Sequence, residues 1–281
     1  MKIGIFIDSV CGPNHHLYNL KGCFKAKFKP FPKVKRTSEF GNFDVIIIAN
    51  NPWGSMKEEY INDTHNVILI MSEPVRPIIK ADIALCNFAG AAFFNKYYSW
   101  IPKYIDNFHF VVKENMMPTD EMMAKILYSP GKYEPNSQNF NYDYFLKKQN
   151  EILKAYRSQY TQIDYTPEEY LGGVRCFKGS FCPVRNEGYL TARIFEALAM
   201  GSVPYIYIEN RAAYKMLEWK GFKHRVNCFI ITRPGIDLPE PTDQMVLAAR
   251  NLYFNQFLPS KMAKFLLDYG RLLIGAKKQN N

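Results

Sequence analysis

The sequence predicts an α/β protein with parallel sheets, and two patterns support this fold class. Short, nearly continuous apolar runs alternate with helical patterns over about the first hundred residues, as expected for parallel strands that are covered on both faces. Several of these runs end in polar or turn-forming residues, which is where open parallel sheets bind their ligands. The chain has 281 residues, of which 47% are hydrophobic. It is therefore long enough for one large or two compact domains and too apolar to be disordered.

The first half of the chain contains four predicted strands. They span Ile3–Asp8, Asp44–Asn50, Val67–Ser72 and Ala81–Cys86. Three of them run into Asp8-Ser9, Asn50-Asn51-Pro52 and Ser72-Glu73-Pro74. We therefore expect the reactive side chains of this half to follow these strands.

A second set of α/β signals begins near Met122. The predicted elements are a strand at Lys125–Ser129, a helix at Tyr142–Gln159, a strand entering a turn at Gly172–Phe177, a helix at Glu187–Gly201, a strand at Val203–Ile208 and a last helix at Lys261–Leu273. Gly201 suits the left-handed C-cap of its helix, and Ser260 is predicted to cap the last helix. The polar stretch Lys113–Asp120 is the predicted domain boundary, so we expect domains at 1–112 and 113–258 and a C-terminal helix with a basic tail at 259–281.

Several classes of protein are excluded at this stage. The apolar runs are far shorter than the roughly 20 residues needed to cross a bilayer, and the chain opens on a predicted strand rather than on a signal peptide. We therefore expect a soluble, cytoplasmic protein. The six cysteines are spread without a CxxC pair or a Cys/His cluster, so no metal site is predicted.

The most informative segment is Phe181–Pro204, which reads FCPVRNEGYLTARIFEALAMGSVP. It predicts a loop that leads into the N-terminus of a helix carrying Thr191 and Arg193. Backbone N–H groups and the helix dipole attract an anion there, and arginine can bind a phosphate through two hydrogen bonds. A diphosphate is the ligand that suits this pattern. The alternative is a helix-surface ion pair between Arg193 and Glu196, which are one turn apart.

This segment resembles the donor-binding signature of exostosin-like glycosyltransferases, in which a loop, a Ser/Thr-x-Arg pair and an EA dipeptide precede a Val-Pro strand entry. Its GYLTARI portion is also similar to the GYVTEKI-type motif of α1,3-fucosyltransferases. Both families have the GT-B architecture, so the resemblance implies two Rossmann-like domains that face each other across a cleft. Ala192 and Arg193 stand where the fucosyltransferase motif has Glu-Lys. This departure favours the exostosin-like family over a transferase for GDP-fucose.

The resemblance also implies roles for individual residues. Arg193 would contact the donor diphosphate, Thr191 and the backbone near Gly188 would help to hold it, and Glu187 or Glu196 would contact ribose or sugar hydroxyls. The neighbouring loop residues Arg185 and Tyr189 are further candidates for substrate binding, as are Ser129 and Lys132 after the strand at 125–128.

A second, weaker resemblance concerns the general base of the reaction. The run Val67–Pro74 is similar to the fucosyltransferase stretch in which a strand ends in the catalytic carboxylate, and Glu73 occupies that place. An inverting transferase needs such a base to take the proton of the attacking hydroxyl. The alternative is an ordinary strand-end carboxylate. Asp8 is the second candidate for the base and His16 the third, and Arg76 could hold the leaving phosphate or pair with Glu73.

The chain carries a formal charge of +10, and the segment Lys21–Arg36 holds seven positive charges, no negative ones and three phenylalanines. Such a segment can bind a nucleic-acid backbone with base stacking, an anionic membrane surface or the acceptor of a transferase. It can also form an edge strand whose lysines oppose aggregation.

These observations lead to one main functional expectation. The chain is expected to be an inverting glycosyltransferase that moves a sugar from a nucleotide diphosphate, with UDP favoured and UDP-xylose as the first donor, to a glycan hydroxyl. Neither a cofactor nor a bound metal is expected, because the helix N-terminus and cationic side chains can neutralise the leaving diphosphate. The absence of a membrane span would suit a bacterial or large-virus enzyme working in the cytoplasm. The rivals are a GDP-fucose transferase, a DNA-modifying sugar transferase and a non-enzymatic nucleic-acid-binding protein.

Overall fold

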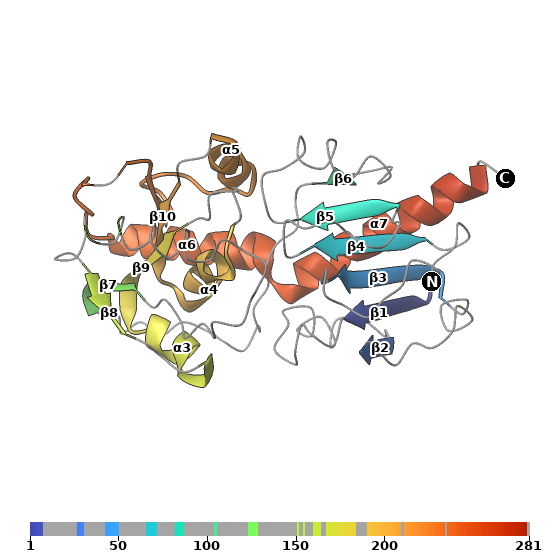
Figure 1. Ribbon diagram of the computed structural model, residues 1–281, viewed down its shortest axis with the longest axis horizontal. Coiled ribbons are helices and arrows are strands. Elements are labelled where there is room, and N and C mark those ends of the chain that lie inside the picture. Colours follow the sequence, from blue (N-terminus) through green and yellow to red (C-terminus); the bar gives the residue numbers. More distant parts are fainter. Residues whose placement is uncertain are drawn as a thin grey trace. The chain divides into compact units, whose positions relative to one another are not determined.

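The computed structural model describes residues 1–7, 27–30, 43–50, 66–71, 82–86, 104–105, 123–128, 151, 154, 160–163, 167–183, 190–208, 211–233 and 235–279. The chain divides into two compact units, one formed by Met1–Lys113 with Phe257–Asn281 and the other by Glu114–Gln256. Each unit has its own parallel sheet (Figure 1). The predicted α/β class is therefore confirmed.

The first unit contains a six-stranded sheet in the order β2-β1-β3-β4-β5-β6. Its strands are β1 (Ile3–Ile7), β2 (Lys27–Pro30), β3 (Val45–Asn50), β4 (Val67–Met71), β5 (Ile83–Cys86) and β6 (Tyr104–Ile105). All their pairings are parallel. Among the described strands β2 lies at one end of this order, so part of the basic segment forms an edge strand, which was one of the predicted alternatives.

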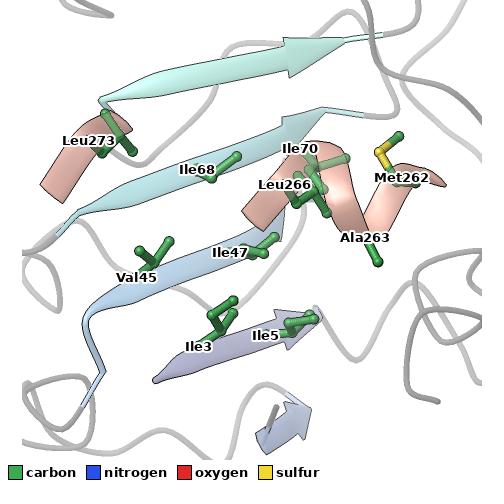
Figure 2. Close-up of a cluster of buried hydrophobic side chains, with 10 residues drawn as sticks. All are labelled: Ile3, Ile5, Val45, Ile47, Ile68, Ile70, Met262, Ala263, Leu266 and Leu273. Atoms are coloured by element: carbon green, nitrogen blue, oxygen red, sulfur yellow. The ribbon is translucent and has the colours of Figure 1, made fainter. Parts of the chain in front are cut away.

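The long helix α7 (Pro259–Gln279) supplies part of the core of the first unit. Figure 2 shows apolar side chains of β1, β3 and β4 gathered beneath the helix. The buried cluster consists of Ile3, Ile5, Val45, Ile47, Ile68, Ile70, Met262, Ala263, Leu266 and Leu273. The strand members alternate along β1, β3 and β4, as expected for one face of a pleated sheet. The segment at 259–281, treated in the sequence as separate from both domains, thus packs on the first sheet.

The second unit contains a five-stranded sheet in the order β11-β10-β9-β7-β8. Its strands are β7 (Met123–Tyr128), β8 (Tyr160–Gln162), β9 (Phe177–Pro183), β10 (Val203–Tyr207) and β11 (Phe229–Ile231). Its described helices are α3 (Pro167–Val174), α4 (Ala192–Met200), α5 (Arg211–Trp219) and α6 (Asp243–Leu252), and the π-helical turn η5 (Tyr253–Phe257) follows α6. Every residue of β10 is buried, which explains the continuous apolar run that predicted this strand.

Two predicted elements and one predicted helix cap differ from the structure. The strand predicted at Gly172–Phe177 is wrong, because its first residues form the last turn of α3 and β9 starts only at Phe177. The helix predicted from Glu187 starts at Ala192 among the described residues, although Gly201 ends it in the left-handed conformation with φ 77°, as predicted. Ser260 does not cap α7, because that helix already begins at Pro259, a residue whose fixed φ suits the first helical position.

Both sheets are wound in the same way. In each unit the first strand lies between the second and the third, with β1 between β2 and β3 and β7 between β8 and β9. The second strand is thus added on one side of the first strand, and the third strand on its other side. The point between the first and third strands, where the strand order reverses, is a topological switch point. In open α/β sheets, ligands bind beside the carboxyl ends of the two strands at such a point. For the second unit, these strands are β7 and β9.

Candidate functional site

The N-terminus of α4 lies at the switch point of the second sheet, because residues 184–191 connect it to the carboxyl end of β9. A sulfur contact holds the two elements together, since the Cys182 thiol in β9 lies 3.6 Å from the backbone carbonyl oxygen of Arg193 in the first turn of α4. The fold therefore places a helix N-terminus, with its outward-facing N–H groups, where this class of sheet binds ligands.

Thr191 is the N-cap residue of α4, yet its side chain makes no cap hydrogen bond. Its hydroxyl oxygen is buried and has no hydrogen-bond partner among the residues that the structure describes. Thr242, the N-cap residue of α6, has nearly the same backbone angles, but its hydroxyl oxygen accepts a hydrogen bond from the N–H of Met245 at 3.2 Å. Buried polar groups normally have partners, so the Thr191 hydroxyl is free to bind a group that enters the site.

Three ionisable side chains meet behind this helix N-terminus. Glu196 lies one turn after Arg193 on α4 and is hydrogen-bonded to Tyr170 of α3. The residue Glu196 is half-buried as a whole, but its carboxyl group lies away from solvent. Burial raises the pKa of Glu196 to about 7, because the loss of hydration outweighs the nearby Arg193 charge and the Tyr170 hydrogen bond, both of which lower it. Burial likewise raises the pKa of Tyr170 well above its usual value, so Tyr170 donates rather than accepts.

The fourth titratable group of this cluster carries no charge at neutral pH. Burial raises the pKa of Cys182 to about 12, so its thiol stays protonated. The charge behind the N-terminus of α4 is therefore set by the Arg193 guanidinium and by the fraction of Glu196 that is ionised. Near pH 7 the cluster is neutral to singly positive, which suits an anionic ligand.

The structure brings together three of the predicted site residues, namely Thr191, Arg193 and Glu196. The predicted alternative, a helix-surface ion pair between Arg193 and Glu196, involves the same side chains. The Glu196 carboxyl group is buried rather than at the surface, and the nearby Arg193 charge lowers its pKa. The remaining candidates lie outside the described residues: Asp8, His16, Glu73, Arg76, Ser129, Lys132, Arg185, Glu187, Gly188 and Tyr189. Their roles stay predictions.

Tyr170 and Cys182 were missed as members of this cluster. For Tyr170 a signal was available, because Thr166-Pro167-Glu168-Glu169 matches the pattern of a helix start with proline in the first turn and glutamate three residues after threonine. Reading that pattern would have predicted α3 in place of the strand. No local pattern shows that Tyr170 reaches Glu196, since the two are far apart in the sequence.

Each unit has a parallel sheet with the same winding, and the similarity to solved structures shows that the protein has the GT-B fold. Comparison with solved structures identifies individual proteins that share this fold over nearly the whole chain. AviGT4, a glycosyltransferase involved in avilamycin A biosynthesis, is 12% identical with a TM-score of 0.58, and the alignment covers 97% of this chain and 98% of that one. HepE from Anabaena, solved in complex with UDP and glucose, is 10% identical with a TM-score of 0.57 and coverages of 96% and 99%.

An α1,3-fucosyltransferase is similar as well, at 10% identity and a TM-score of 0.50, with 98% of this chain and 90% of that chain covered. No protein-family model matches the chain, and no curated protein sequence matches it. At these identities the comparisons establish the fold. Within the described ranges, no helix is long and apolar enough to span a membrane.

Proposed function

We propose that the protein is a glycosyltransferase that binds the diphosphate of a nucleotide-sugar donor at the N-terminus of α4. The observation that carries this proposal is the Thr191 hydroxyl, which lies buried at the N-cap position and has no hydrogen-bond partner within the described part of the chain. A phosphate oxygen would accept the hydrogen bond of this hydroxyl at the positive end of the helix dipole. The GT-B fold supports the same assignment, because AviGT4 and the α1,3-fucosyltransferase, which share it, are glycosyltransferases.

Arg193 is the proposed cation for the diphosphate. It is the second residue of α4, so its guanidinium and the helix dipole act on the same ligand. Charge stabilisation of this kind lowers the free energy of the leaving diphosphate as negative charge develops on it. We propose on this ground that transfer proceeds without a bound metal ion.

The donor we propose is a UDP-sugar, with UDP-xylose as the first to be tested. The structure of HepE with UDP and glucose supports the choice of UDP. GDP-fucose is the second candidate, because an α1,3-fucosyltransferase shares the fold, whereas the Ala192-Arg193 pair argues against it. The acceptor would be a glycan hydroxyl, reached in the cytoplasm. Transfer would proceed with inversion, with Glu73 as base ahead of Asp8 and His16.

The decisive experiment measures the binding of UDP, GDP and a panel of their sugars by calorimetry, followed by turnover. Arg193→Ala should weaken nucleotide binding by roughly 10- to 100-fold, since a hydrogen bond to a charged group contributes about 1.5–3 kcal/mol. Arg211→Ala is the matched control, because Arg211 is an exposed arginine at the start of another helix of the same unit. In the same assay Glu73→Gln should keep nucleotide binding and lose transfer.

Two results would contradict the proposal. If Arg193→Ala binds nucleotides as tightly as the unsubstituted protein does, the donor site does not lie at α4. If no UDP or GDP compound binds the unsubstituted protein, the proposed transferase function is wrong. The melting temperature of each variant serves as the control for folding.

A further inference from the structure

The Tyr170–Glu196 hydrogen bond is more than a packing contact, because it joins α3 to the charged cluster behind the proposed donor site. The groups that act on the Glu196 carboxyl, among the described residues, are Arg193 of the same helix and Tyr170 of α3. The charges of Arg193 and Glu196 both affect the pKa of the Cys182 thiol in β9, but burial keeps this thiol protonated and neutral. Among the described members of the cluster, Glu196 is therefore the one whose charge changes near neutral pH.

We propose that Tyr170 is a positioning residue for the donor site, which acts through Glu196 to set the charge that the bound diphosphate meets. The inference rests on the proposed function. Tyr170 touches neither the diphosphate nor the sugar in this account. Its hydroxyl donates a hydrogen bond that favours the ionised carboxylate beside Arg193, and burial opposes that ionisation.

The consequence is a coupling between nucleotide binding and proton uptake. A diphosphate at the N-terminus of α4 brings negative charge close to Glu196 and therefore favours its neutral form. The pKa of Glu196, about 7 without ligand, should rise when the nucleotide binds, so the protein takes up a proton from solution. By linkage, the affinity for UDP should fall by up to about tenfold per pH unit above neutrality, until the pKa of the bound state is passed.

The test counts the protons taken up per UDP bound, by calorimetry in two buffers of different ionisation enthalpy, between about pH 6 and pH 9. Glu196→Gln cannot titrate, so its value gives the contribution of the UDP phosphates themselves. The unsubstituted protein should take up as much as one proton more per UDP than Glu196→Gln does. This difference should be largest above neutral pH. Tyr170→Phe removes the hydrogen bond that lowers the pKa of Glu196, so its maximum should lie at a higher pH.

Tyr205→Phe is the matched control. The Tyr205 hydroxyl is the donor of another tyrosine hydrogen bond of the same unit, to the backbone carbonyl of Pro239, and it takes no part in the cluster. The loss of this hydrogen bond in Tyr205→Phe should reduce the stability of the protein and leave the pH of maximal proton uptake unchanged. A purely structural role for Tyr170 would give the same result as this control. If Glu196→Gln proves too unstable to measure, the comparison of Tyr170→Phe with Tyr205→Phe decides alone.

The outcomes separate this inference from the proposed function. Two results would contradict the positioning role and leave the proposed donor site intact. In the first, UDP binds and the unsubstituted protein and Glu196→Gln take up the same number of protons. In the second, UDP binds and the pH of maximal proton uptake is the same in Tyr170→Phe as in the unsubstituted protein. If neither UDP nor GDP binds the unsubstituted protein, the proposed function is wrong and the inference fails with it.

Discussion

Thr191 and Thr242 occupy the same position on two helices of one unit but use their hydroxyl groups differently. Both have extended backbone angles at the N-cap, with φ and ψ of −71° and 154° for Thr191 and −80° and 157° for Thr242. Only Thr242 caps its helix. Because the backbone conformations agree so closely, the difference lies in the side chain, and the unused hydroxyl is the one at the switch point of the sheet.

This pair gives a test that separates stability from binding. Thr191→Val removes a buried hydroxyl that has no partner among the described residues, so the free energy of unfolding should stay equal or rise by up to about 1 kcal/mol. Nucleotide affinity should fall by roughly fivefold, which corresponds to the loss of about 1 kcal/mol from one hydrogen bond. Chemical denaturation and calorimetry with UDP measure the two quantities.

Thr242→Val should behave in the opposite way. The loss of its bond to the N–H of Met245 should lower the free energy of unfolding by about 1 kcal/mol, and UDP affinity should not change. If Thr191→Val instead destabilises the protein as Thr242→Val does, its hydroxyl serves the helix rather than a ligand.

At the scale of elements, α7 shows how a helix from the far end of the chain completes the core of the first unit. Leu266 is fully buried within the cluster beneath this helix, and Leu272, on the same helix, is 65% exposed (Figure 2 for Leu266). Lys277 near the end of α7 lies 3.5 Å from Asp82, and cations in the last turn also suit the negative end of the helix dipole. The helix is thus fixed both by apolar burial and by charge.

Leucine-to-alanine substitutions along α7 should therefore differ sharply. Leu266→Ala should lower the free energy of unfolding by about 2–5 kcal/mol, because it leaves a cavity against the sheet. Leu272→Ala should change it by no more than about 0.5 kcal/mol. Hydrogen exchange should become faster in β1, β3 and β4 for Leu266→Ala, since these strands supply the rest of the cluster. Equal effects of the two substitutions would show that α7 does not cover this sheet in solution.

The same elements show what the sequence could predict. Continuous apolar runs located β1, β3, β4 and β10, because parallel strands buried on both faces have a strong local signature. The ends of helices were less accessible. The last helix was predicted from Lys261, although Pro259 fits the first helical position, and the glycines at 172 and 173, which disfavour a helix interior, concealed the end of α3.

At the scale of the whole molecule, the fold class followed from the order of strands and helices, and the place of the candidate site followed from one segment. The predicted Thr191 and Arg193 do lie at a helix N-terminus beside the carboxyl end of a strand. The failure of Thr191 to cap and the approach of Tyr170 to Glu196 could not be predicted. Both depend on three-dimensional contacts between α3, β9 and α4, and no short-range spacing encodes them.

The overall charge of +10 provides the last prediction, because seven of the positive charges lie in Lys21–Arg36 and the proposed donor site lies on α4 of the second unit. A protein of this charge should bind duplex DNA weakly and in a salt-dependent way. Replacing Lys21, Lys25, Lys33 and Lys35 with glutamine, while keeping the lysines of β2, should lower the slope of log affinity against log salt by up to about 3.6, since each phosphate contact contributes about 0.9. The affinity for UDP should not change. A parallel loss of UDP affinity would place the basic segment in the donor site, and tight DNA binding at physiological salt without any nucleotide binding would favour the non-enzymatic rival.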